Sequence, residues 1–293
     1  MTDPIPPKSI FANAKVDAEA AKHIPSSPQT EHAAYDLAFQ DKEFLLRPDL
    51  RPVRFQLELL KPELFLDEQK IGSTFVFYGS ARVPEPEKAQ LLLKAAKTDK
   101  ERVIAERLVA KSHYYDVARE LAGLVSQTDR DPEGKRHFVV CSGGGPSFME
   151  AANRGAQDVG AESIGLNIVL PHEQLPNPYV TPSLSFQFHY FALRKMHFLL
   201  RARAVAVFPG GFGTFDEMFE LLTLIQTGKV RPLPILLYGR EFWERVVNFH
   251  ALVEEGVISE RDLDLLTWCE TAQEGWAKVC DYYESQTPAC ATR

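Results

Sequence analysis

The sequence predicts an α/β protein with a Rossmann-like, doubly wound parallel sheet, helices on both faces and accessory helices before it. Short apolar runs typical of strands recur along the chain, and helical stretches separate most of them, which is the arrangement of parallel βαβ units. Two runs end in glycine-rich turns that open helices. With 293 residues, 45% of them hydrophobic, the chain has enough apolar material for one such domain with extensions, or for two small domains.

The chain before residue 71 differs in composition from the rest. Residues 1–30 are rich in Pro, Ser, Asp and Ala without apolar periodicity, so we expect a flexible arm, or one that orders only against a partner subunit. Residues 31–70 carry scattered helical patterns and predict one or two accessory helices. We expect the main domain over residues 71–286 and a flexible tail over 287–293.

Strand and helix patterns alternate within the main domain. The first strand reads TFVFY at residues 74–78 and ends in Gly79-Ser80, and prolines 84 and 86 then precede a long helical stretch. The expected strands are residues 74–78, 137–141, 163–169, 183–188, 204–208 and 234–238. The expected helices are residues 87–126, 147–159, 191–203, 214–228, 241–255 and 272–284.

Composition excludes several classes of partner. The net charge is −7 and no segment concentrates Lys and Arg, so nucleic acid is not expected as a partner. No apolar run reaches the roughly 20 residues that cross a bilayer, and the N-terminus lacks the pattern of a secretory signal. The four cysteines show neither CxxC pairing nor metal-ligand spacing. We therefore expect a cytoplasmic protein with free thiols, no metal and no membrane contact.

Two glycine-rich turns are the candidate ligand site. Residues 141–150 read CSGGGPSFME and residues 208–217 read FPGGFGTFDE, and each turn joins an apolar strand to a helix. In open parallel sheets ligands bind beyond the carboxyl ends of the strands, where glycines let backbone N–H groups approach an anion and helix N-termini favour negative charge. The two turns together predict a site that holds a phosphate and a sugar.

Neither turn matches a common nucleotide-binding motif. Phe148 stands where a dinucleotide fingerprint needs glycine, and Val230 stands where a Walker motif needs Ser or Thr after Gly228-Lys229. Both turns also fit the S/T-x-x-E capping box, in which a glutamate only satisfies a backbone N–H. From local spacing alone, Glu150 and Glu217 could be helix caps instead of site residues.

Four stretches in the same order resemble the LOG family of phosphoribohydrolases, long labelled "lysine decarboxylase-like". Residues 209–217 (PGGFGTFDE) match its PGGxGTxxE signature, and residues 143–156 match its GGGPxxMEAANRGA stretch. Residues 193–196 (LRKM) and 78–82 (YGSAR) resemble its RK-M helix and opening turn. Besides these four, residues 171–179 (PHEQLPNPY) resemble a loop of its longer bacterial members. The resemblance covers about residues 74–250; relative to compact members, about residues 85–111 form a helical insertion.

The resemblance implies an activity and a set of site residues. Characterised members hydrolyse cytokinin riboside 5′-monophosphates or AMP to the free base and ribose 5-phosphate, without cofactor or metal, and are dimers or larger. Arg194 and Glu217 occupy the catalytic positions: the carboxylate would stabilise positive charge on the ribose and activate water, and the guanidinium would hold the substrate. The implied substrate contacts are Ser80, Gly144, Gly145, Met149, Glu150, Lys195, Gly210, Gly211, Gly213 and Thr214.

Two rival functions stay open on sequence grounds. The same cleft could bind or sense a nucleotide without turning it over. The historical label suggests a decarboxylase that uses pyridoxal phosphate, but no lysine with a partner acid is identified for a Schiff base. The preferred base, whether adenine, prenylated adenine or another, does not follow from one sequence.

Overall fold

The computed structural model describes residues 13–171 and 175–286 of the chain. It divides into two units, Met1–Glu58 and Leu59–Arg293. The expected tail and the first 12 residues of the expected arm lie outside the described residues, and so do positions 172–174 of the PHEQLPNPY loop. Within the described parts, no helix is long and apolar enough to cross a membrane.

The first unit consists of short helices. Helix α1 (Ala14–Ala20) falls inside the range expected to be an arm, and α2 (Lys42–Leu46) and the start of α3 (Arg51–Glu68) fall inside the range expected to be helical. The side chains of Asn13 and Asp41 cap α1 and α2 by accepting backbone N–H bonds. Ala18 is the single buried residue between residues 13 and 58, so the described part of this unit has no core of its own.

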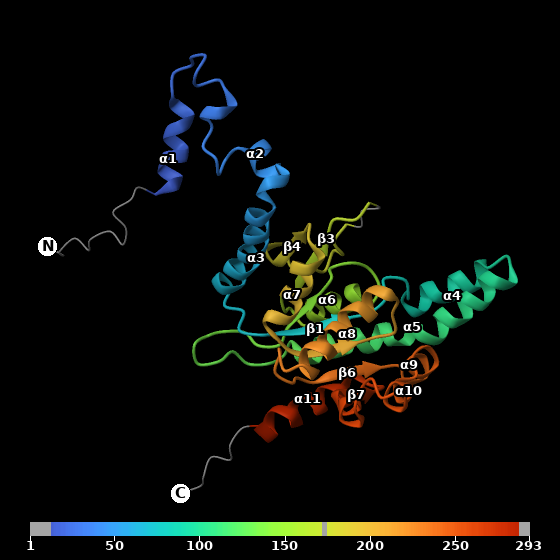
Figure 1. The fold of residues 1–293 in the computed structure, drawn as a ribbon. Helices are drawn as coiled ribbons and strands as arrows, with labels where there is room; N and C mark the ends of the chain where they lie inside the picture. Colours follow the sequence, from blue (N-terminus) through green and yellow to red (C-terminus); the bar gives the residue numbers. More distant parts are fainter. Residues whose placement is uncertain (1–12, 172–174, 287–293) are drawn as a thin grey trace, which may run out of the picture. The chain divides into compact units, whose positions relative to one another are not determined.

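The second unit contains a sheet of seven strands, all parallel, in the order β4-β3-β2-β1-β5-β6-β7. Figure 1 shows β3 and β4 on one side of β1 and β6 and β7 on the other. From β1 the chain builds outward through β4 on one side and then through β7 on the other, which confirms the predicted doubly wound fold. The strands are β1 (Thr74–Tyr78), β2 (Val139–Ser142), β3 (Ile164–Ile168), β4 (Ser185–Phe188), β5 (Ala202–Val207), β6 (Ile235–Tyr238) and β7 (Leu266–Cys269).

Helices cover both faces of this sheet. They are α4 (Pro86–Ala95), α5 (Asp99–Val125), α6 (Phe148–Asp158), α7 (Phe191–Leu200), α8 (Phe212–Gln226), α9 (Arg240–Val246), α10 (Phe249–Glu254) and α11 (Ala272–Gln286). The single helix expected over 87–126 is wrong, because the chain is extended at Ala96 and Thr98 starts α5 with a capping box to Glu101. The helix expected over 241–255 is likewise divided into α9 and α10, and β7 was not predicted.

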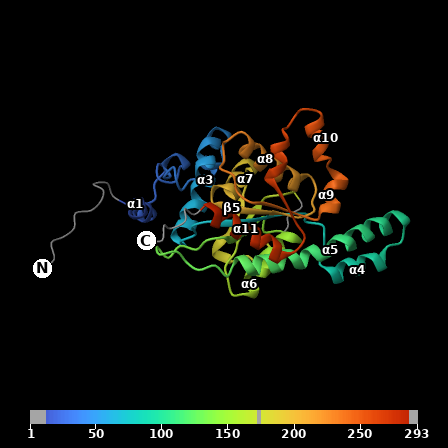
Figure 2. The ribbon, with the colours of Figure 1, turned by 90° about the horizontal axis from the view of Figure 1, so that it is seen from below.

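Alternate side chains of the central strand enter two separate cores. Val76 and Tyr78 pack in a cluster with residues of α7 and α8, whereas Phe75 and Phe77 pack in a cluster with residues of α5, α6 and α11. Figure 2 shows α5 and α6 on one side of the sheet and α8 and α10 on the other. Because both faces are covered, all five residues of β1 are buried, and the uninterrupted apolar run TFVFY follows from this burial.

The sheet order brings the two glycine-rich turns together. β1 lies between β2, which leads into residues 143–145, and β5, which leads into residues 208–213. All strands are parallel, so both turns and the Gly79-Ser80 turn after β1 lie at the same edge of the sheet. This edge is the point where the strand order reverses, and it is where open α/β sheets bind ligands.

Candidate active site

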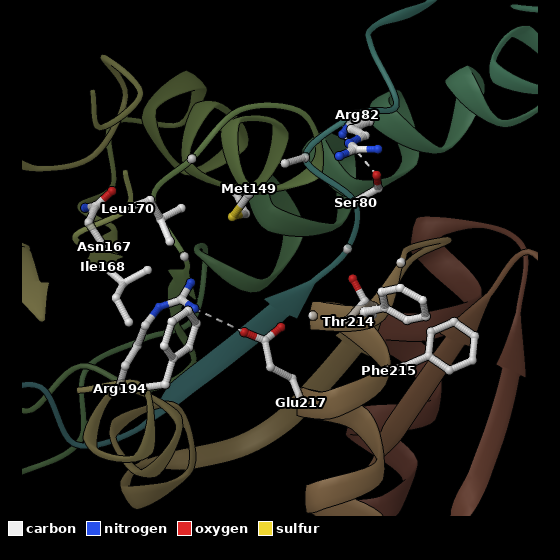
Figure 3. Close-up of a pocket in the computed structure, with 18 of the residues that line it drawn as sticks. Ser80, Arg82, Met149, Asn167, Ile168, Leu170, Arg194, Thr214, Phe215 and Glu217 are labelled. Carbon is white, nitrogen blue, oxygen red and sulfur yellow. Dashed lines mark hydrogen bonds and ion pairs between the residues drawn. The ribbon is translucent and has the colours of Figure 1, made fainter. Parts of the chain in front are cut away.

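A cavity of about 850 Å³ opens at this edge (Figure 3). It is lined by the turn after β1, by both glycine-rich turns, by the end of β3 and by residues of α7 and α8. The described lining residues are Gly79, Ser80, Ala81, Arg82, Gly143, Gly145, Met149, Asn167, Ile168, Leu170, Phe191, Arg194, Gly211, Phe212, Gly213, Thr214, Phe215, Glu217 and Val246. The cavity therefore joins the two predicted turns to both predicted catalytic residues.

The turn between β5 and α8 presents backbone donors to the cavity. Gly211 is the N-cap of α8 and makes no side-chain capping bond, so the first N–H groups of the helix stay available to a ligand. A side chain at Gly210 would overlap Thr214, which is buried beneath the turn. The turn thus needs glycine both to pack on Thr214 and to bring its backbone to the cavity.

Neither predicted capping box forms. Thr214 lies inside the first turn of α8, three residues after the N-cap, and Glu217 points into the cavity. Ser147 is the N-cap of α6 but makes no side-chain cap bond; its hydroxyl donates to the carbonyl of Val83. The assignment of Glu150 and Glu217 as helix caps is therefore wrong.

The turn between β2 and α6 makes room for a cationic side chain. A Cβ at Gly143 would lie 2.5 Å from Nη2 of Arg194 and 2.7 Å from Sδ of Met149. Gly144 has a φ of +70°, a left-handed conformation that favours glycine. The approach of Arg194 thus accounts for Gly143, and the backbone geometry accounts for Gly144.

Arg194 from helix α7 and Glu217 from helix α8 point toward each other at the wall of the cavity (Figure 3). Nη1 of Arg194 lies 3.5 Å from Oε1 of Glu217, and the two side chains are only 12% and 14% exposed. Nε of Arg194 donates to the carbonyl oxygen of Leu166 at 2.7 Å, and its guanidinium lies 5.1 Å from the ring centre of Phe198. These contacts fix the guanidinium and leave part of its donor fork for a ligand.

The environment of Glu217 changes its acidity. Burial raises the pKa of this carboxyl to about 7, and the neighbouring Asp216 and Glu220 add to the rise, whereas Arg194 and Lys195 oppose it. A carboxyl with a pKa near 7 is present in both protonation states at neutral pH. Such a group can take a proton from water and return it within one reaction cycle.

The cavity includes eight of the twelve predicted site residues. They are Ser80, Gly145, Met149, Arg194, Gly211, Gly213, Thr214 and Glu217. Gly144, Glu150, Lys195 and Gly210 are not among the described residues that line it.

The two charged exceptions have other partners. Lys195 forms ion pairs with Asp216 and Glu220, at 3.1 and 3.0 Å. Glu150 accepts a hydrogen bond from the hydroxyl of Tyr115 at 2.9 Å and lines a smaller cavity of about 140 Å³, which shares Ala81 and Arg82 with the main one.

Sequence reasoning missed several lining residues. Asn167 lies at the end of β3, where an amide in a buried strand could have drawn attention; its Nδ2 is buried and has no hydrogen-bond partner within residues 13–171 and 175–286. Phe212 occupies the variable position of the PGGxGT turn and is 96% exposed. Leu170, Phe191 and Val246 complete an apolar part of the wall that no motif indicated.

The fold and the site together define a class: a doubly wound α/β protein whose cavity lies at the switch point and holds a buried carboxyl–guanidinium pair. Residues 149–279 match a family model described as "Possible lysine decarboxylase". With the matches below, this confirms the resemblance seen in the sequence. The chain is therefore similar to the LOG family over this range.

Curated relatives resemble this chain at moderate identity. It is 26% identical to cytokinin riboside 5′-monophosphate phosphoribohydrolase LOG3 of Arabidopsis thaliana over 176 residues, which cover 59% of this chain and 77% of the relative. It is 30% identical to the pyrimidine/purine nucleotide 5′-monophosphate nucleosidase of Escherichia coli K12 over 116 residues, which cover 36% of this chain and 25% of that protein.

Solved structures also resemble the fold. The molybdenum cofactor carrier protein of Chlamydomonas reinhardtii is similar at 16% identity with a TM-score of 0.43; the match covers 72% of this chain and 98% of that one. The molybdenum cofactor binding protein of Rippkaea orientalis is similar at 15% identity with a TM-score of 0.42; that match covers 72% and 95% of the two chains.

Proposed function

We propose that this protein hydrolyses the N-glycosidic bond of a nucleoside 5′-monophosphate and releases the free base and ribose 5-phosphate. The observation that carries the proposal is the buried pair of Glu217 and Arg194, which faces a cavity formed by two glycine-rich turns. The similarity to a cytokinin riboside 5′-monophosphate phosphoribohydrolase and to a nucleotide 5′-monophosphate nucleosidase supports it. Binding alone would not require a buried carboxylate beside an anionic ligand.

The 5′-phosphate would lie against the first turn of α8. Backbone N–H groups at Gly211, Gly213 and Thr214 suit an anion, and the partial positive charge at the start of this 15-residue helix adds to the attraction. Arg194 could then contact the phosphate or a ribose hydroxyl with the donors that Leu166 does not occupy.

The carboxylate of Glu217 would act at the anomeric carbon. As the C1′–N bond breaks, its electron pair leaves with the base and positive charge develops on the ribose, which a nearby carboxylate stabilises. Glu217 would also take a proton from the attacking water as the new C1′–O bond forms, and the departing base gains a proton. The pKa of about 7 supports this role, because the group can accept and release that proton near neutral pH.

We propose AMP or a cytokinin riboside 5′-monophosphate as the substrate, and the apolar wall formed by Leu170, Phe191, Phe212 and Val246 supports a large base at the cavity mouth. We also propose that the protein forms a homodimer or a larger assembly and is located in the cytoplasm.

A panel of nucleoside 5′-monophosphates tests the function. Each is incubated with the protein, and free base and ribose 5-phosphate are measured by chromatography. We expect both products in equal amounts from at least one purine nucleotide. Tight binding of a nucleotide without release of base would favour the alternative of a nucleotide-binding or sensing protein. In a separate incubation with lysine, release of carbon dioxide would favour the decarboxylase.

A further inference from the structure

Asn177 packs behind the first glycine-rich turn. Its backbone N–H donates to the carbonyl oxygen of Gly144 at 2.8 Å, and its side-chain Nδ2 donates to the carbonyl oxygen of Gly145 at 2.9 Å. Asn177 is buried and is not among the described residues that line the cavity, whereas Gly145 is. The turn therefore has Asn177 on one side and the cavity on the other.

A buried polar network holds the amide of Asn177 in one orientation. Nδ2 also donates to Oδ1 of Asn153 at 2.9 Å, and Oδ1 of Asn177 accepts from the backbone N–H of Tyr179 at 3.2 Å. Asn153 is fully buried and in turn accepts from Ser142, whose hydroxyl oxygen accepts from the N–H of Gly144 at 3.1 Å. Every polar atom of the two amides is used, so exchange of N and O would break several bonds.

This arrangement determines where the N–H of Gly145 points. In a trans peptide the C=O and N–H groups point in opposite directions, so a Gly144 carbonyl directed at Asn177 turns the Gly145 N–H away from it, toward the cavity. That N–H has no acceptor within the described chain. Pro146 has no N–H, so the next peptide adds no competing donor.

We propose that Asn177 is a positioning residue that fixes the N–H of Gly145 as a hydrogen-bond donor to a ribose hydroxyl of the nucleotide. The proposal rests on the proposed function. The phosphate is assigned to α8, which follows β5, whereas Gly145 follows β2, on the other side of β1 in the sheet. A nucleotide that extends from α8 past Glu217 would bring its sugar to Gly145.

Deoxynucleotides test this donor directly. The ratio of kcat/KM for the ribonucleotide to that for its 2′-deoxy or 3′-deoxy counterpart is measured in wild type and in Asn177→Ala. Because the variant should weaken one hydrogen bond, from the Gly145 N–H to a ribose hydroxyl, we expect the ratio for either the 2′ or the 3′ position to fall about fivefold. An unchanged ratio at both positions, in a folded variant, would overturn the proposal.

Thr181→Val is the matched control. The hydroxyl of Thr181 accepts from the N–H of Ser163 at 2.9 Å, so it anchors the same segment to the start of β3, but it does not contact the glycine turn. We expect this variant to keep the wild-type ratio to within about twofold. An equal change of the ratio in both variants would show that Asn177 only holds the segment in place, and would also overturn the proposal.

A measurement on Glu217→Gln, which should bind the nucleotide without cleaving it, covers the case in which Asn177→Ala fails to fold. In protein labelled with ¹⁵N-glycine, the Gly145 amide resonance, assigned by its loss in Gly145→Ala, should move downfield on addition of the ribonucleotide and less with one deoxy counterpart. No difference between these ligands would contradict the proposal. Binding constants for the same ligands separate it from the proposed function, because a protein that binds but does not cleave can still distinguish the hydroxyl.

Discussion

Glu217 is the residue on which the account depends. Its carboxyl is buried on the inner side of α8, and one guanidinium at 3.5 Å opposes the cost of that burial only in part, so the pKa stays near 7. A carboxyl kept in such an environment destabilises the folded protein at neutral pH without ligand. Perturbed acids of this kind are typical of functional sites.

Replacement of Glu217 by glutamine should separate catalysis from binding. We expect base release to fall by about 10³-fold or more, because the neutral amide can neither stabilise the ribose cation nor accept a proton. Affinity for the nucleotide should stay within about tenfold, or roughly 1.4 kcal/mol. Steady-state kinetics and calorimetry of Glu217→Gln measure the two quantities.

Glu220→Gln is the control on the same helix. Glu220 pairs with Lys195 and is not among the described residues of the main cavity, so activity should stay within about twofold of wild type. If Glu217→Gln were as active as this control, Glu217 would have no part in the chemistry.

The pH dependence of stability gives an independent check. The pKa of Glu217 is about 7 in the folded protein against 4.5 for an ordinary glutamate, so the folded protein keeps a proton that the unfolded chain has released between these pH values. Wild-type stability therefore falls as pH rises through this window, by at most about 3 kcal/mol from this group. Glu217→Gln lacks this contribution. The free energy of unfolding of the variant relative to wild type, measured with urea, should therefore rise between pH 4.5 and 8. An equal difference at both pH values would contradict the assigned pKa.

The sequence predicted the site at the level of motifs better than at the level of contacts. Glycine turns and charged positions follow from local patterns, so Arg194 and Glu217 were found and both face the cavity. Lys195 sits beside Arg194 in sequence, but a helix turns adjacent residues to different faces, and Lys195 meets Asp216 and Glu220 instead. Asn167 was missed because a single amide in a strand carries no motif.

At the scale of elements, repeated apolar and helical patterns predicted the strands and helices reliably, whereas breaks within a helical stretch were not predicted. Six of the seven strands were predicted, since each is a short apolar run next to a turn. The edge strand β7 was missed because its four residues, LTWC, are only partly buried and carry little alternation. The break between α4 and α5 depends on the cap at Thr98, which a long charged helical pattern conceals.

The packing of α5 against α6 depends on a glycine. A Cβ at Gly155 would overlap the backbone oxygen of Arg119 and lie 2.9 Å from Cβ of Ala122. Helices α5 and α6 would therefore have to move apart. We expect Gly155→Ala to lower the free energy of unfolding by about 3 kcal/mol. Denaturant unfolding measures this.

Gly213→Ala serves as the comparison for Gly155→Ala. Apart from its chain neighbours and the backbone of its own helix, no atom of the described chain lies within 4 Å of a Cβ at Gly213, and the backbone there is ordinary helix. Its stability should remain within about 1 kcal/mol of wild type. Equal stability losses in the two variants would show that helix contact is not the cause.

At the scale of the molecule, an apolar surface supports the prediction of at least a dimer. Met196 and Leu200 on α7 are nearly half exposed, and they line a second cavity of about 870 Å³ with Leu224, Val230 and Leu233. We expect light scattering at micromolar concentration to give about 66 kDa or more, twice the chain mass of 33.0 kDa. Leu200→Asp should lower this mass. A wild-type monomer would contradict the prediction.

A crystal structure of Glu217→Gln with a bound nucleoside 5′-monophosphate tests the central claim most directly. We expect the phosphate on the backbone N–H groups of Gly211, Gly213 and Thr214, with C1′ facing the side chain at position 217, within about 4 Å. A nucleotide bound elsewhere, or one in this cavity whose anomeric carbon points away from position 217, would contradict it.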